Sequence, residues 1–393
     1  MTNHFQSNLW KMYLFQFFTS LHFLGGVLVP FFLDWGQINF TQIMILQAWF
    51  MFWVFILEIP TGAVADYLGR KWSLLLGCLA NIIAVIVYTS MPNFYIFLVG
   101  EFFWAMASAL MSGADQALVY DSLKKIKDEK QSKKVLGRME SFSLIALMVS
   151  APIGSIIASF FGLRMTMLLL AVPLLIATFI SLTFHEPKTS RKVESTRYLN
   201  ILRTGITYFH KNKVLKILAL DMVIITSIAY FMIWLYQPLL KQSGVNLIYF
   251  GLVHAAFVAS QILIINLSPK LEQWFGSKKK LLFYGALITG ISFVVGGLTT
   301  FLPLVILIII LGGGFGLSRR TVMASYLNKQ IPSPQRATIL STISMLRQAV
   351  QVILNPAVGF MVDWSLNYTL IILGLAAIIF AFISRVEEEH LID

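Results

Sequence analysis

Hydrophobic residues occur along the chain in long runs that short polar segments interrupt. Most of these runs approach or exceed the roughly 20 apolar residues that an α-helix needs to cross a bilayer. Turn-forming residues separate runs that follow each other closely, as at Met91-Pro92-Asn93. The pattern predicts an all-α membrane protein with twelve transmembrane helices, over residues 9–33, 40–62, 72–91, 94–121, 139–161, 164–184, 214–239, 247–268, 281–301, 302–327, 337–362 and 365–385.

The composition excludes an ordinary soluble protein. Of 393 residues, 58% are hydrophobic and only 12% are charged, with a mean hydropathy of +0.77, whereas soluble domains carry about 25% charged residues. The net charge of +12 does not indicate nucleic acid, because the basic residues lie next to the apolar runs, where they set topology and attract anionic lipids. The first run, 9–33, is too long for a cleavable signal, and we expect it to be retained.

Basic residues alternate between the polar gaps, and this alternation predicts the orientation. Of the thirty Lys and Arg residues, only Arg164 and Lys241 fall in the gaps on the less basic side. The positive-inside rule places the basic gaps and both termini in the cytoplasm, which requires an even number of spans. We expect a multi-pass protein of the plasma membrane, such as a bacterial inner membrane.

A long basic gap divides the chain into two halves of six spans each. Its later part has apolar residues at the spacing of an amphipathic helix, at Leu199, Leu202, Ile206 and Phe209. The predicted domains are an N-terminal six-helix bundle (1–186), a cytoplasmic central loop with an amphipathic helix (187–213) and a C-terminal six-helix bundle (214–393).

The loop after the second span carries a motif at residues 62–71, with the sequence GAVADYLGRK. A glycine is followed four residues later by an aspartate, then by a second glycine and two basic residues, and a weaker copy occupies residues 273–278 in the second half. With six plus six spans and a basic central loop, this motif resembles the loop between the second and third spans of the major facilitator superfamily (MFS). Tyr67 departs from that pattern, which usually has a basic residue there. The resemblance implies the MFS fold, two six-helix bundles around a central cavity.

The resemblance also implies that the motif is a conformational latch. An acidic residue at the inner end of span four pairs with the loop in family members, and Asp121 occupies that place here. The basic residues can contact carboxylates or the C-terminal ends of helices in the opposite half. We expect a network that holds the outward-open state; alternatively, these charges only fix the topology. The latch candidates are Gly62, Asp66, Gly69, Arg70, Lys71 and Asp121.

Ionisable residues inside apolar runs are costly and therefore functional candidates. Glu101 and Asp115 lie fourteen residues apart in span four, almost four helical turns, so we predict that both line one face as a proton relay. A polar helix–helix contact is the alternative for Asp115. His22 in span one is a further proton-coupling candidate, because an imidazole titrates near neutral pH; the alternative is a packing role.

Span eleven contains polar residues at steps of three and four, which predicts a polar stripe along one helix face lining a substrate cavity. Arg347 lies about ten residues into this run, too deep to reach water easily. We expect it to need an anionic partner, either a carboxylate such as Glu101 or a group on the solute. The stripe consists of Arg347, Gln348, Gln351 and Asn355.

Two further signals are weaker. Residues 150–155 in span five resemble, with substitutions, a Gly-Pro motif of the antiporter branch, which favours export. Arg319 and Arg320 lie lower in span ten, and we expect at least one of them to be an interfacial anchor.

No catalytic constellation accompanies these residues. There is no zinc-spaced Cys/His set and no phosphate-binding loop, and a single cysteine excludes an internal disulfide. We expect no enzyme activity, no cofactor and no metal site. The predicted function is proton-coupled export of a small amphipathic solute by a monomer, with the solute, protons and the lipid bilayer as partners and no nucleic acid. The alternatives are proton-coupled import of a nutrient or metal-chelate, and a non-transporting membrane receptor or scaffold.

Overall fold

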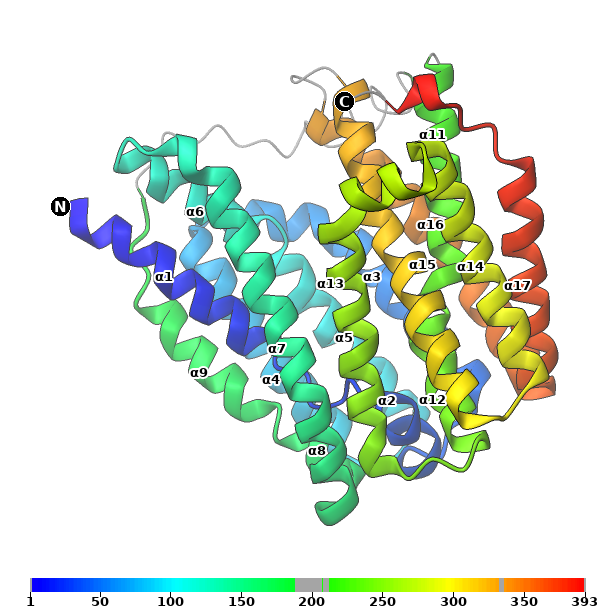
Figure 1. Cartoon of the computed structure of the whole chain (residues 1–393). Helices are drawn as coiled ribbons and strands as arrows, with labels where there is room; N and C mark the ends of the chain where they lie inside the picture. The colour runs from blue at the N-terminus through cyan, green and yellow to red at the C-terminus, as the bar shows by residue number, and fades with distance from the viewer. Residues whose placement is uncertain (1, 188–206, 208–211, 332–335, 392–393) are drawn as a thin grey trace. The chain divides into compact units, whose positions relative to one another are not determined.

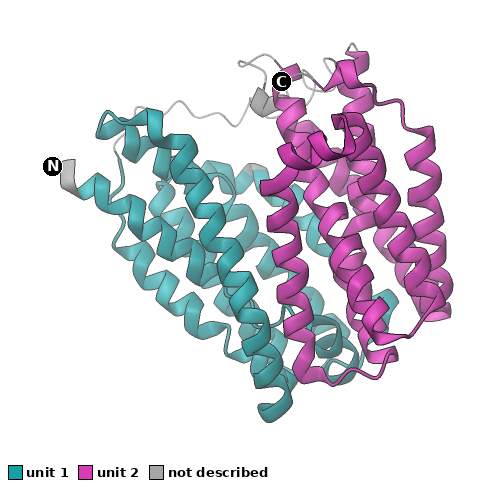
Figure 2. Ribbon diagram, viewed as in Figure 1, with its two compact units in different colours: residues 1–198 teal, residues 199–393 magenta. Residues whose placement is uncertain are grey.

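The computed structural model describes residues 2–187, 207, 212–331 and 336–391. Within these residues the regular elements are helices, and no strand occurs. The chain forms two compact units, residues 1–198 and 199–393 (Figure 2). The predicted amphipathic helix within 187–213 falls on residues outside the described ones.

The helices of the first unit follow the predicted apolar runs (Figure 1). Close packing joins α4 to both α5 and α9, α3 to α5, and α1 to both α7 and α9. These elements are α1 (Thr2–Thr19), α2 (Leu28–Pro30), the π-helix η1 (Phe31–Trp35), α3 (Phe40–Tyr67), α4 (Arg70–Ser90), α5 (Phe94–Met111), α6 (Ala114–Lys125), η2 (Glu129–Gln131), α7 (Ser132–Phe161), α8 (Leu163–Leu168) and α9 (Ala171–Leu182).

The second unit is also a helical bundle, in which α14 packs along α17 and α15, and α15 packs along α13 and α11. Its elements are α11 (Lys213–Tyr230), α12 (Met232–Gln242), η3 (Leu247–Tyr249), α13 (Phe250–Phe275), α14 (Lys278–Leu298), α15 (Leu302–Gln330), α16 (Arg336–Trp364), α17 (Leu366–Ile383) and η5 (Glu388–His390).

Eleven helices or pairs of joined helices among the described residues are long and apolar enough to cross a membrane. The predicted run 9–33 is not among them, because it is not one continuous helix. α1 begins with polar residues and ends at Thr19, and turns occupy the residues before α2. The first predicted span is therefore interrupted near its middle.

Three other spans are interrupted as well, and span six divides into α8 and α9 at Leu169 and Leu170. Span four divides into α5 and α6 at Ser112 and Gly113, where Gly113 adopts a left-handed φ of +72°. Span seven divides into α11 and α12 at Phe231. Such interruptions leave backbone groups free of the regular helical ladder, which lets side chains nearby take positions that a straight helix would not allow.

Each unit has its own apolar core. In the first unit Met12, Phe15, Leu74 and Cys78 are fully or almost fully buried between α1, α4, α6, α7 and α9. In the second unit the core lies mainly between α11, α15 and α16. Large apolar side chains elsewhere remain exposed, as expected for surfaces that face lipid tails.

Candidate functional site

The loop between α3 and α4 brings the start of α4 to a carboxylate from the end of the unit. Gly69 adopts a φ of +107°, which side-chain-bearing residues rarely tolerate, and α4 begins directly after it. The backbone N–H groups of Arg70 and Lys71 donate hydrogen bonds to the Glu186 carboxylate at 3.1 and 2.8 Å. The negative carboxylate thus caps the positive N-terminus of α4.

The basic side chains of the motif contact other helices of the same unit. The Arg70 guanidinium forms an ion pair with Asp121 on α6 and donates to the Ala117 carbonyl at 2.5 Å. Lys71 donates its Nζ to the Leu182 carbonyl, at the C-terminal end of α9, at 2.7 Å. The structure therefore brings Arg70 and Asp121 together, and the helix end that Lys71 contacts belongs to its own unit.

The remaining latch candidates lie in the last turns of α3. Asp66 is half-buried there. Outside its own stretch of helix, no atom of the described residues lies within 4 Å of where a Cβ on Gly62 would be, so their packing does not require glycine at that position. Sequence reasoning missed Glu186; the signal that could have found it is an acidic residue shortly after both the sixth and the twelfth span, Glu186 and Glu388.

The second half repeats this local arrangement. Gly276 has a φ of +86° just before α14, and the N–H groups of Lys278 and Lys279 donate to the Glu388 carboxylate at 3.0 and 2.7 Å. Burial acts to raise the pKa of Glu388, but hydrogen bonds from Lys279, Lys278 and Ser277 outweigh it and lower the pKa. Each half thus begins its third span with a glycine turn and a carboxylate cap.

Glu101, on α5, is buried in the first unit with 5% of its surface exposed. Its carboxyl accepts a hydrogen bond from Gln47 Nε2 at 3.1 Å, and Tyr88 on α4 also hydrogen-bonds to it. Both partners are neutral. Ionising a buried carboxyl group costs free energy because the charge is removed from water, and neutral donors offset this cost only in part. Gain or loss of a proton by Glu101 therefore changes the energy of its surroundings strongly.

Aromatic side chains surround Tyr88 and Glu101. The Tyr88 ring lies 5.4 Å from Phe97 and 5.8 Å from Trp104, measured between ring centroids. A Cβ on Gly100 would come within 2.8 Å of the Tyr88 ring, so the glycine permits this close approach. The buried Glu101 carboxyl is therefore held by a tyrosine that packs among aromatic side chains.

His22 approaches the same aromatic cluster from span one. It lies between α1 and α2, in the interrupted part of the span, and its ring stacks on Trp104 with centroids 5.8 Å apart. The sequence prediction placed His22 on a continuous helix, and that placement is wrong. The turn moves its side chain to a position that helical periodicity does not give.

Asp115 and Glu101 lie on separate helices, α6 and α5. The prediction that both line one helix face assumed a continuous span four, and the break at Gly113 invalidates it. Asp115 accepts a hydrogen bond from Gln16 on α1 at 2.6 Å, whereas Glu101 bonds to Gln47 on α3. The two carboxyl groups therefore have separate local partners.

The span-five motif packs against the interrupted part of span one. Ser150 Oγ donates to the His22 carbonyl at 3.1 Å. A Cβ on Gly154 would come within 1.6 Å of the Phe23 carbonyl oxygen, so only glycine allows this contact between α7 and the turn. The motif therefore supports the non-helical backbone that carries His22.

The polar stripe of α16 faces α11 in the second unit. Gln351 is fully buried and donates Nε2 to the Ser227 carbonyl at 3.1 Å. The buried Oε1 atoms of Gln348 and Gln351 have no hydrogen-bond partner among the described residues. Asn355 is also fully buried, and Arg347 is half-buried with Arg320 near enough to repel its charge. These acceptors and Arg347 offer a polar surface inside the unit.

Two buried polar clusters in the second unit were not expected. Arg319 forms a buried ion pair with Asp221 and donates to the Leu282 carbonyl, while Ser384 donates to Asp221 at 2.6 Å. Arg319 therefore ties helices together and is not an interfacial anchor. In a separate cluster, Tyr236 hydrogen-bonds to His254 at 2.9 Å.

Comparison with protein families decides the class. A sequence model described as Major Facilitator Superfamily matches residues 12–353, most of the chain. The chain belongs to the major facilitator superfamily. This MFS chain is thus a membrane transporter by type, and the eleven helices of membrane-crossing length among its described residues agree with a multi-pass location. A comparison with curated proteins finds no match.

Solved transporters are similar to this MFS chain in fold. The nucleoside transporter NupG superposes with a TM-score of 0.77 at 14% identity, covering 96% of this chain and 98% of NupG. A POT family transporter in complex with 5-aminolevulinic acid gives 0.75 at 15% identity, covering 98% and 96%. A D-xylose-proton symporter gives 0.76 at 12% identity, covering 98% of each chain. These TM-scores establish a shared fold, and the low identities leave the substrate open.

Proposed function

We propose that this protein is a proton-coupled secondary active transporter that exports a small amphipathic solute by alternating access. The observation that carries the proposal is the environment of Glu101. Its carboxyl group is buried among aromatic side chains and held by Gln47 and Tyr88, which are both neutral. Loss of its proton leaves an uncompensated charge, so a cationic group of a solute entering the site would replace the proton favourably.

The surroundings of this carboxyl group favour an amphipathic solute. Trp104 and Phe97 offer apolar faces beside the acid, and an aromatic face also attracts a cation. In the second unit, Arg347 and the unsatisfied amide oxygens of Gln348 and Gln351 can bind polar groups. The surroundings of Glu101 by themselves suit a solute with an apolar body and a cationic group.

Proton-coupled import by the same fold is the second candidate. It is favoured by the likeness to the D-xylose-proton symporter, although the fold is compatible with either direction. In this case the proton on Glu101 would accompany the solute. The two candidates therefore differ in the sign of proton movement that a solute gradient causes.

The test is proton movement in proteoliposomes that contain the purified protein. A panel of lipophilic cations, metal chelates, nucleosides, sugars and short peptides is applied as an outward or inward gradient, and the internal pH is followed. The Glu101→Gln variant keeps the size of the side chain but cannot release a proton. Glu129→Gln is the matched control, because Glu129 is exposed on η2 and lies outside the site.

We expect at least one solute to drive a pH change that Glu129→Gln retains and Glu101→Gln abolishes. Counterflow of protons against the solute supports export by antiport, and co-movement supports import by symport. Solute-driven proton movement that persists in Glu101→Gln would contradict the assigned role of Glu101. Solute movement without any proton movement would contradict proton coupling altogether.

A further inference from the structure

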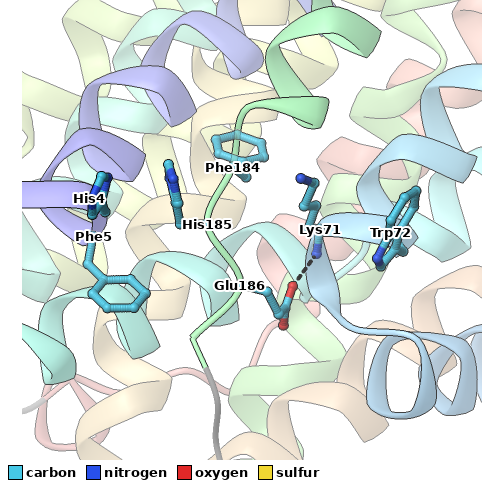
Figure 3. Close-up of a pocket in the computed structure, with 7 residues that line it drawn as sticks. All are labelled: His4, Phe5, Lys71, Trp72, Phe184, His185 and Glu186. Atoms are coloured by element: carbon cyan, nitrogen blue, oxygen red, sulfur yellow. Dashed lines mark hydrogen bonds between the residues drawn. The ribbon is translucent and has the colours of Figure 1, made fainter. Parts of the chain in front are cut away.

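A pocket lies at one end of the first unit, where the start of α1, the segment after α9 and the start of α4 meet. Its volume is about 410 Å³ and it opens to the surface. Figure 3 shows His4 beside His185, with Lys71 and Trp72 coming from α4. The pocket is lined by His4, Phe5, Lys71, Trp72, Phe184, His185 and Glu186.

Basic side chains gather around this pocket. The rings of His4 and His185 have centroids 4.8 Å apart. Lys11 donates its Nζ to the Thr183 carbonyl at 2.9 Å, beside the pocket. Burial lowers the pKa of His185, and the positive charges of Lys11, His4 and Lys71 lower it further. The basic groups are thus close enough to repel one another, and an anion between them would relieve that repulsion.

The acid in the pocket is bound by the start of α4. Glu186 directs its two carboxylate oxygens to the backbone N–H groups at the start of α4, at 3.1 and 2.8 Å. The pocket wall is also held in place. Asn8, which is fully buried, donates to the His185 carbonyl at 2.8 Å and accepts from the His185 N–H at 3.0 Å. His185 therefore has a fixed backbone from which to present its ring.

Tryptophan side chains mark the level of this pocket in the membrane. Trp10 and Trp72 are 54% and 46% exposed. The Lys11 Nζ lies 5.9 Å from the Trp10 ring, and the Lys71 Nζ lies 5.7 Å from the Trp72 ring. Exposed tryptophans with adjacent lysines are typical of the membrane–water interface, where headgroups lie. The distribution of basic residues predicts that this end faces the cytoplasm.

We propose that this pocket binds the phosphate group of an anionic phospholipid. The ring N–H groups of His4 and His185 and the ammonium of Lys71 would donate hydrogen bonds to the negatively charged phosphate oxygens. The exposed tryptophans would pack against the glycerol and upper acyl region. A soluble phosphate compound shares the anionic chemistry but would make no use of Trp10 and Trp72, so the structure favours the lipid.

The experiment is native mass spectrometry of the full-length protein in detergent, titrated with phosphatidylglycerol. Phosphatidylcholine is the neutral lipid control, and inorganic phosphate is added in a separate arm. His4→Gln/His185→Gln removes both imidazoles. Lys133→Gln/Lys134→Gln is the matched control, because it removes two exposed basic residues at the start of α7. His185→Lys replaces an imidazole with another cationic donor.

We expect phosphatidylglycerol to bind the wild type more tightly than phosphatidylcholine. The double histidine variant should weaken phosphatidylglycerol binding about tenfold, while the lysine control and His185→Lys should stay close to the wild type. Thermal melting of each variant checks that it is folded. Equal binding by the double histidine variant and the wild type would overturn the proposal. Displacement of phosphatidylglycerol by millimolar inorganic phosphate would overturn the lipid assignment and identify a soluble phosphate compound.

Discussion

At the scale of single residues, carboxyl groups in this protein have distinct tasks that their partners determine. Asp121 meets a guanidinium, Glu186 meets backbone N–H groups, and Glu101 meets only an amide and a phenol among the contacts described above. A charged partner compensates an ionised carboxylate, whereas neutral partners compensate it less. Asp121 therefore joins α6 to α4 through a charge pair, whereas the side chains that bind Glu101 are neutral.

Replacing Asp121 with asparagine should weaken the contact between α4 and α6. The side chains of Arg70 and Asp121 are 19% and 10% exposed, so water screens the pair only partly, and Asp121→Asn removes a partly buried ion pair that joins the two helices. If the pair latches one conformation, the conformational balance should shift by about fivefold or more and solute transport should slow. Initial transport rates and accessibility of introduced cysteines measure both effects.

The control for this variant is Glu129→Gln, because Glu129 is exposed and lies outside the latch. It should transport like the wild type. Wild-type rates and accessibility in Asp121→Asn would show that the ion pair is not a latch and only contributes to local structure.

At the scale of elements, the sequence predicted where the helices lie but did not predict where the spans are interrupted. Apolar runs and turn residues predicted the helices, because burial in lipid requires long stretches of paired backbone groups. The same reasoning placed Glu101 and Asp115 on one face and His22 on a helix. Both placements failed, because Gly113 and the turn before α2 interrupt the periodicity from which they were calculated.

Contacts between segments far apart in the chain could also not be predicted from the sequence. The Asp221–Arg319 pair joins α11 to α15 across 98 positions, and nothing in local spacing indicates it.

For the motif at 62–71, in contrast, one long-range partner could be predicted. Its residues resemble a known family pattern, so Asp121 could be named as the partner of the loop before any contact was seen, while Glu186 lay outside the pattern and was missed.

Gly154→Ala tests the contact between α7 and the interrupted part of span one. A Cβ at this position would lie 1.6 Å from the Phe23 carbonyl oxygen, so the turn or the helix must move. We expect a loss of stability of about 2 kcal/mol or more, seen as a lower melting temperature in detergent.

Gly137→Ala is the matched control on the same helix. In the described part of the chain, no atom beyond the neighbouring helical residues lies within 4 Å of a Cβ at Gly137. Alanine also favours a helix over glycine, so this variant should be as stable as the wild type or slightly more stable. Equal melting temperatures for Gly154→Ala and the wild type would show that the contact is not required.

At the scale of the whole molecule, the two units share a local plan at the start of their third spans. Gly69 and Gly276 have positive φ, and Glu186 and Glu388 cap the helices that follow. The basic gaps alternate along the entire chain in step with the spans. This regularity predicts one orientation for all the loops.

Cysteine labelling in intact cells tests that orientation. Lys133→Cys places a thiol in a gap predicted to be cytoplasmic, and Tyr95→Cys places one beside a gap predicted to be outside; both positions are exposed. A membrane-impermeant maleimide should label only Tyr95→Cys in intact cells and should label both variants after the cells are opened. Labelling of Lys133→Cys alone in intact cells would reverse the topology.

The native cysteine is buried, so it does not react in this labelling experiment. Its reactivity also reports how often the helices around it separate. Cys78 is the single cysteine of the chain and has 0% of its surface exposed. A small thiol reagent that dissolves in the membrane can reach it only while the neighbouring helices separate. The rate at which the unmodified protein loses its free thiol therefore reports how often the first bundle loosens, without any inserted label. A solute that tightens this bundle would slow the reaction, so candidate solutes can be ranked on the wild-type chain before transport is assayed.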